Sequence, residues 1–222
     1  MHNRLLFFKQ SFNFNIFVVI SFFAMALFTG KGDNGTTKVF NTEKGTRISK
    51  ASAVAEALGS LDEINSFLGL CKIEAASRGL YVATEHPSFE HVIHELQEGL
   101  FTVQAEVAGA AKSISENKVL WMEDIINTIE KELPPITSFF ISGGTELAAR
   151  LDVARTLARR AERRVVEVRE PIDPSTGKMK GEWRKISEQT LAFLNRLSSI
   201  LYALARLSNH KSGIKESAPT YE

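Results

Sequence analysis

The clearest sign of chemistry in the sequence is a stripe of charged side chains: Arg155, Arg159, Glu162 and Arg163. Spacings of three and four residues place them on one sector of an α-helix, because each residue advances about 100°. Arginine's planar guanidinium binds phosphate oxygens bidentately, and a carboxylate among arginines orients them or accepts a metal ion. The stripe therefore predicts an anion site, although a solvated helix face with weak ion pairs shows the same spacing.

A second candidate lies upstream, where residues 29–37 read TGKGDNGTT and Lys38 follows. The glycines let the main chain approach a ligand and point amide groups at phosphate oxygens. Threonine hydroxyls and the ammonium groups of Lys31 and Lys38 add donors, and Asp33 adds a carboxylate. The loop predicts a phosphate site, with a simple polar turn as the alternative, since Gly, Asn and Asp are common turn residues.

The same glycines spell G-x-G-x-x-G after the apolar run 16–28, the order seen in dinucleotide-binding turns. That fingerprint requires a helix directly after the glycines and an acidic residue at the end of a second parallel strand. The sequence instead predicts strand or loop over 39–47 and helices beyond residue 50, so we reject this fold. A P-loop is rejected as well, because Thr36 and Thr37 stand where Lys and Ser/Thr are required.

Composition narrows the class of protein. The 222 residues are 44% hydrophobic, which suits one domain with a full core. The net charge of +1 argues against broad nucleic-acid binding, so no nucleic-acid partner is expected. Cys71 is the sole cysteine and fits a reducing compartment, from which we expect a cytoplasmic location. His91 and His94 lie one turn apart, but no further His or Cys cluster completes a metal site.

Five amphipathic segments must position these groups, and they predict an all-α, five-helix bundle. Within the charged segment, apolar residues recur from Leu147 to Val168 in alternating steps, so one face packs into the bundle. Pro134 and Pro135 begin a stiff turn that should display Phe139 outside any helix. The predicted helices cover residues 51–78, 87–112, 116–133, 144–169 and 183–210.

Residues 1–28 form a hydrophobic extension, rich in phenylalanine and free of acidic side chains. Its apolar run, 16–28, is shorter than the roughly 20 residues that a membrane helix needs. Three origins remain open: a targeting segment, including one for the mitochondrial matrix; a membrane anchor; or a wrongly chosen start codon. No spacer separates the apolar run from the glycine-rich loop, so cleavage of the extension as a secretion signal would damage that loop. We expect the folded domain to cover residues 29–222.

Over about residues 29–209 the chain resembles the ATP:cob(I)alamin adenosyltransferase family of the propanediol-utilisation type. The matching blocks are TGKGDNGTT, Lys50 ahead of GSLDEINS at 59–66, LPPITSFFISGG at 133–144, RRAERR at 159–164 and FLNRLSS at 193–199. The resemblance implies a five-helix bundle that assembles as a homotrimer, with ATP bound between neighbouring subunits. The helix count read from periodicity agrees with that fold.

The resemblance also assigns roles to residues of the predicted ATP site. Arg159 and Glu162 would act in catalysis, and Glu162 would contact the Mg²⁺ that accompanies ATP. The full ATP site would comprise Thr29, Gly30, Lys31, Gly32, Asp33, Thr37, Lys38, Lys50, Arg159, Arg160, Glu162, Arg163 and Asn195.

Two further pairs follow from the same resemblance. Asp62 and Arg155 would pair across the subunit interface and orient the site. Phe139 and Phe193 would form the apolar side of the cobalamin pocket. One departure concerns Ser199, which stands where the family commonly has aspartate, so any carboxylate role at that position is lost or moved.

The implied reaction is attack of reduced cobalt in cobalamin on the 5′ carbon of ATP, giving adenosylcobalamin and tripolyphosphate. A reductase that supplies the reduced cobalt is a candidate partner. Two other readings of the residues stay open: a helical bundle that binds an acidic or nucleic-acid partner without turnover, and a nucleotide hydrolase.

Overall fold

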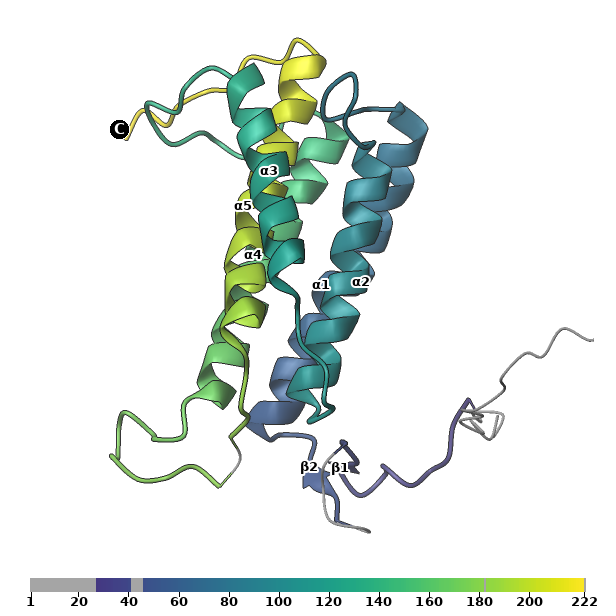
Figure 1. The fold of residues 1–222 in the computed structure, drawn as a ribbon, viewed down its shortest axis with the longest axis vertical. Coiled ribbons are helices and arrows are strands. Elements are labelled where there is room, and N and C mark those ends of the chain that lie inside the picture. The colour runs from purple at the N-terminus through teal and green to yellow at the C-terminus, as the bar shows by residue number, and fades with distance from the viewer. Residues whose placement is uncertain (1–26, 41–45, 182, 222) are drawn as a thin grey trace, which may run out of the picture.

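The computed structural model describes residues 27–40, 46–181 and 183–221, and over these residues the chain forms a bundle of five helices (Figure 1). Helix α4 packs against α5 and α1, while α2 packs on α1 and α3 on α5. The predicted bundle of five helices is thereby confirmed. The helices are α1 (Ala53–Arg78), α2 (Phe89–Val107), α3 (Glu116–Glu132), α4 (Glu146–Arg169) and α5 (Glu188–Lys211).

Each of these helices begins directly after a serine or threonine that caps it. The cap oxygen accepts a hydrogen bond from a backbone N–H in the first turn, which stabilises a helix by about 1 kcal/mol. Every first turn also contains a glutamate, which is favourable near the positive end of the helix dipole. The caps are Ser52, Ser88, Ser115, Thr145 and Ser187, and the first-turn glutamates are Glu56, Glu90, Glu116, Glu146 and Glu188.

The observed helix ends lie within two residues of the predicted ones except at two places, where they differ by five residues. The predicted helix 87–112 ends at Val107, shortly before Gly109 takes a positive φ of 97°. The predicted helix 183–210 starts late because Ser187 is its cap, and the buried Glu106 carboxylate accepts from the Ser187 N–H at 2.8 Å. A long-range contact of this kind leaves no trace in the local apolar pattern.

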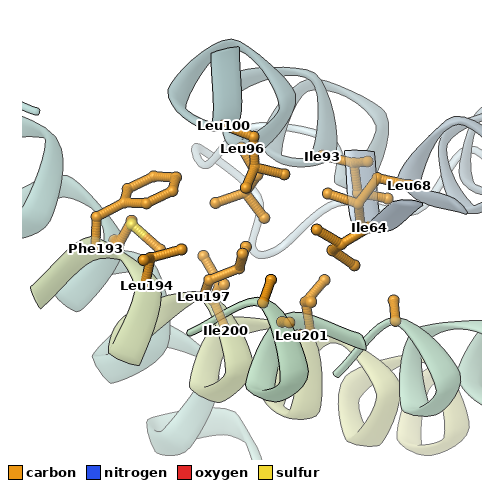
Figure 2. Packing of buried hydrophobic residues seen from close by; sticks show 14 of the residues in the cluster. Ile64, Leu68, Ile93, Leu96, Leu100, Phe193, Leu194, Leu197, Ile200 and Leu201 are labelled. Carbon is orange, nitrogen blue, oxygen red and sulfur yellow. The ribbon is translucent and has the colours of Figure 1, made fainter. Parts of the chain in front are cut away.

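The core is one cluster of apolar side chains drawn from all five helices. Figure 2 shows α1, α2 and α5 contributing Ile64, Leu96 and Leu197 to a shared layer. The alternating apolar positions of α4 are all wholly buried, as predicted: Leu147, Leu151, Ala154, Ala158, Ala161, Val165 and Val168.

A small sheet, absent from the predicted all-α class, lies at the start of the domain. Strand β1 (Thr36–Thr37) pairs antiparallel with β2 (Ile48–Ser49), with Thr36 opposite Ser49. The sheet ties the glycine-rich loop to the segment that leads into α1. Two-residue strands are too short to show a period, so the sequence could not reveal them.

The two ends of the bundle carry different segments. The strands lie at one end and the C-terminus at the other (Figure 1). The loop between α3 and α4 lies at the C-terminal end, because the Ile141 N–H donates to the Ser217 carbonyl at 2.8 Å.

Residues 1–26 of the predicted extension lie outside the described residues, and Leu27 and Phe28 are exposed. Within the described part of the chain, no helix has both the length and the apolar character needed to cross a membrane.

Candidate functional site

The glycine-rich loop folds into successive tight turns. The Asp33 N–H donates to the Gly30 carbonyl and the Gly35 N–H to the Gly32 carbonyl, both at 3.1 Å. Gly30 and Gly35 have φ values of 67° and 77°, which residues other than glycine rarely adopt. The conformation of the loop thus depends on glycine at these two positions.

Lys50, the residue directly after β2, contacts this loop. Its backbone N–H donates to the Gly35 carbonyl at 2.9 Å, and its ammonium lies 3.1 Å from the place of a Cβ on Gly32. A larger residue at Gly32 would therefore push this ammonium away. The side chains of Lys31, Lys38 and Lys50 form no ion pair within the described ranges, so their charge is available to an anion.

A second feature is a pocket of about 540 Å³ at the other end of the bundle. Its walls are the α3–α4 loop, the first half of α4 and the second half of α5. Phe139 lines it and is 80% exposed, as expected for an aromatic side chain displayed by the Pro134-Pro135 turn. The pocket offers an apolar surface beside the arginines of α4.

Buried polar side chains of α5 hold the aromatic loop in place. The Arg206 guanidinium, 5% exposed, donates to the Pro134 carbonyl at 3.3 Å and lies over the Phe140 ring at 5.0 Å. Its Nε also pairs with Glu216 at 2.9 Å, which brings the C-terminal segment to the pocket. Asn209 completes the anchoring, because its Nδ2 donates to the Gly143 carbonyl at 2.8 Å.

Arg155 lines the pocket beside a carboxylate of its own chain. Its Nε lies 3.6 Å from Asp152 Oδ1 but makes no hydrogen bond within the described residues, although the atom is buried. The guanidinium also lies 5.8 Å from the Tyr202 ring centre, and burial raises the pKa of the Tyr202 hydroxyl. A buried donor without a partner is costly, so Arg155 retains capacity for another acceptor.

The arginines of α4 divide between two faces. Arg160 and Arg164 pair with Glu63 and Glu56 of α1, the second pair at 3.5 Å. Arg159 instead lines the pocket, and its guanidinium has no hydrogen bond or ion pair to any other described residue. Because neighbouring helix positions differ by about 100°, Arg160 points away from Arg159, and its predicted contact with ATP gains no support. Arg163 curls back, its Nη1 donating to the Arg159 carbonyl at 3.1 Å.

Asn195 and Glu162 meet between α5 and α4, as the predicted site requires. The Asn195 Nδ2 donates to Glu162 Oε1 at 3.2 Å. The described residues contain no cluster of three His, Cys, Asp or Glu side chains that could hold a metal ion by themselves. Glu162 fits Mg²⁺ only as a single carboxylate, which is the usual arrangement when phosphate oxygens supply most of the ligands.

Phe193 and Asp62 occupy different settings. Phe193 is fully buried among core residues (Figure 2). A Cβ on Gly99 of α2 would lie 2.5 Å from its ring. Phe193 therefore packs in the core of this chain and does not line the pocket described above, so its predicted contact with cobalamin gains no support. Its apolar period fits either role, so the sequence could not separate them. Asp62 is exposed on α1 and pairs with no described residue, so its predicted pairing with Arg155 stays a prediction.

Residues 27–208 match the family model described as cobalamin adenosyltransferase. The chain belongs to the cobalamin adenosyltransferase family. The match covers the glycine-rich loop and most of the pocket residues, while Asn209 and Glu216 of the pocket lie just beyond it.

The chain is also similar to proteins named as corrinoid adenosyltransferases. It is 36% identical over 193 residues to the corrinoid adenosyltransferase PduO of Citrobacter freundii, a match that covers 84% of this chain and 50% of PduO. It is 36% identical over 197 residues to the corrinoid adenosyltransferase of Bacillus subtilis, covering 86% of this chain and 90% of that protein. The chain thus spans about half the length of PduO but nearly all of the Bacillus enzyme.

A solved structure shares the fold of this family member. It is a variant of the PduO-type ATP:corrinoid adenosyltransferase of Lactobacillus reuteri, complexed with cobalamin and ATP. The TM-score is 0.71 at 27% identity, over 88% of this chain and 99% of that one.

The predicted site residues of the family domain do not all line one pocket in a single chain. The glycine-rich loop contains β1, at the strand end of the bundle (Figure 1). The pocket, which Arg159 lines, is formed by the α3–α4 loop and by residues of α4 and α5. The sequence missed the pocket side chains Asp152, Tyr202, Arg206 and Asn209. Asp152 carried one signal, its position one turn before Arg155, but the other three lie in an apolar helix pattern typical of the core.

Proposed function

We propose that this protein transfers the 5′-deoxyadenosyl group of ATP to the cobalt of reduced cobalamin. The observation that carries the proposal is the pocket, in which an exposed phenylalanine and an unpaired arginine, Phe139 and Arg159, line one space. An apolar ring suits a corrinoid face, and a free guanidinium suits a phosphate chain. Membership of the family supports this pairing of ligands.

The chemical step needs no side-chain nucleophile. The cobalt of cob(I)alamin donates an electron pair to the 5′ carbon of ATP, the bond from that carbon to the 5′ oxygen breaks, and tripolyphosphate leaves with its electrons. The protein would orient the reactants and stabilise the charge on the leaving group. Arg159, Arg163 and Lys50 would supply that stabilisation, and Glu162 with Asn195 would orient MgATP.

Phe139 would act on the other substrate. Its exposed ring, placed beside the cobalt, would exclude water and the lower base of cobalamin, which favours reduction to the nucleophilic state. Phe193 takes no direct part in this proposal, because its ring is enclosed in the core.

We further propose a homotrimer in which the loop of one subunit meets the α4–α5 face of its neighbour. The glycine-rich loop and Lys50 do not line the pocket within one chain, which supports this arrangement. So does the buried Nε of Arg155, which lacks a hydrogen bond within the described part of the chain. Asp62 of an adjacent subunit is our proposed partner for it.

An anaerobic assay with cob(I)alamin, ATP and Mg²⁺ tests the activity. We expect the corrinoid absorption spectrum to change to that of adenosylcobalamin, with one tripolyphosphate released for each adenosyl group transferred. Phosphate release without any change at the corrinoid would identify a nucleotide hydrolase, and binding without turnover would identify a binding module.

Mixed oligomers test the shared site. Lys50→Ala and Arg159→Ala should each be nearly inactive alone, since each removes one half of the cationic surface. Random mixing of the two variants in equal amounts should create about one intact site in four if neighbours share a site. A mixture that stays inactive would show that one chain builds the whole site or that subunits do not exchange. Co-expression of both variants removes the second explanation.

A further inference from the structure

A chain of three polar contacts crosses the bundle from α3 through α5 to α4. Glu123 of α3 accepts from Arg196 Nε at 2.9 Å. Arg196 Nη1 donates to Asn195 Oδ1 at 2.7 Å, and Asn195 Nδ2 donates to Glu162 Oε1 at 3.2 Å. Glu123 and Arg196 do not line the pocket, yet this series of contacts connects them to Asn195 and Glu162, two residues of the proposed ATP site.

The charges along the chain fix the orientation of the Asn195 amide. Arginine only donates hydrogen bonds, so the amide oxygen must face Arg196. An ionised carboxylate only accepts, so the amide nitrogen must face Glu162. A flipped amide would lose both contacts at once. Asn195 therefore presents one defined face to a ligand, and one oxygen of Glu162, Oε2, is left without a hydrogen bond to any described residue.

We propose that Glu123 and Arg196 are positioning residues for ATP: they hold the Asn195 amide, and through it the Glu162 carboxylate, in the orientation that binds the nucleotide with its magnesium ion. This inference rests on the proposed function, because it takes Asn195 and Glu162 as ligand-binding groups. Glu123 holds Arg196 through Nε, so that Nη1 stays directed at Asn195. Without Glu123 the guanidinium is free to rotate into solvent, since its side chain is 37% exposed.

A second ion pair between α5 and α3 provides a control, because it links the same two helices without contacting the proposed ATP site. Lys211 and Glu132 also link α5 to α3, at 2.8 Å, with side-chain exposures of 25% and 32%. Glu123 and Arg196 are joined at 2.9 Å with exposures of 36% and 37%. Neither Glu132 nor Lys211 touches Asn195 or Glu162. Loss of either pair should cost the fold similarly little, because exposed ion pairs contribute weakly to stability.

The experiment compares Glu123→Ala with Glu132→Ala in the full chain. ATP affinity is measured by titration calorimetry with Mg²⁺, KM and kcat by the anaerobic assay, and stability by thermal unfolding. We expect Glu123→Ala to weaken ATP binding and raise KM for ATP about three- to tenfold, as for one weakened hydrogen bond, with kcat much less affected. Glu132→Ala should leave ATP affinity and KM at wild-type values, although it should lower the unfolding temperature as much as Glu123→Ala does. Glu123→Gln, which keeps an acceptor for Arg196 Nε, should recover most of the affinity.

The reference variant Asn195→Ala distinguishes the ways in which this inference can fail. Equal ATP affinities in Glu123→Ala and Glu132→Ala, with a clear loss in Asn195→Ala, would overturn the positioning role and leave the proposed function standing. Unchanged affinity in Asn195→Ala would overturn the inference together with the assignment of Asn195. Absence of corrinoid turnover in the unaltered protein would count against the proposed function itself.

Discussion

The side chain of Asn209 occupies the space that any side chain on Gly144 would need: a Cβ there would lie 2.7 Å from Asn209 Cγ. Gly144 has a φ of 105°, which adds backbone strain for any other residue. Asn209 uses this close approach to bond both sides of the glycine. Its Nδ2 donates to the Gly143 carbonyl and its Oδ1 accepts from the Thr145 N–H at 2.9 Å. The start of α4 and one wall of the pocket are thereby locked to α5.

Gly144→Ala should loosen this lock. Strain at a positive φ and the clash with Asn209 together should lower the free energy of unfolding by about 2 to 4 kcal/mol, measured by urea denaturation. Gly143→Ala is the matched control, because its φ of 125° brings strain but no atom lies within 4 Å of its Cβ position. The clash is refuted if the two variants lose the same stability.

The apolar spacing of the sequence predicted the helices well, but it did not predict the buried polar residues that hold the loops in place. The buried face of α4 from Leu147 to Val168 follows from apolar spacing alone, and the helix count follows in the same way. Buried polar groups such as Arg206 and Asn209 break that logic. Their partners lie in the α3–α4 loop and the C-terminal segment, so only the folded chain shows why polar residues stand there. Phe193 is the converse case, since a family motif does not reveal that this side chain is enclosed in the core.

Arg159→Ala should greatly weaken ATP binding while the helical fold persists. Its guanidinium borders the pocket and makes no hydrogen bond or ion pair with another described side chain, so its loss breaks no such bond. A charged hydrogen bond to phosphate is worth about 1.5 to 3 kcal/mol, or roughly ten- to a hundredfold in affinity. Arg150→Ala is a control on the same helix, because that side chain does not line the pocket and its one ion pair to a described residue is with Glu146. Wild-type ATP affinity in folded Arg159→Ala would contradict the assignment.

A chain beginning at Ala26 should fold and remain active. The family match starts at residue 27, and both strands of the small sheet lie within the described residues. Circular dichroism and the anaerobic assay measure the two properties. If removal of residues 1–25 abolished folding, the extension would have to be part of the core and the domain boundary at 29 would be wrong.

Cys71 should resist thiol reagents in the folded protein. Burial raises the pKa of its thiol to about 11, with Arg150 opposing the shift, so the reactive thiolate is scarce at pH 8. The unfolded thiol ionises near pH 8.5. The neutral thiol therefore favours the folded state below about pH 8.5, and this contribution is lost as pH rises toward 11. Labelling with a chromogenic disulfide at pH 8 should follow global unfolding; fast labelling of the native protein would disprove the burial argument.

Phe139→Ala and Phe193→Ala should have opposite signatures. Phe139 is 80% exposed, so its loss should leave thermal stability near the wild-type value and impair adenosylation more than ATP binding. Phe193 is fully buried, and its replacement should cost about 3 to 5 kcal/mol of stability. The role of Phe139 is isolated by comparing turnover of pre-reduced cobalamin with turnover of cobalamin that is reduced while bound. If its ring excludes water and the lower base from cobalt, Phe139→Ala should depress the second rate more than the first. An unchanged ratio of the two rates, together with a sharp fall in stability, would make Phe139 a structural residue and remove it from the pocket.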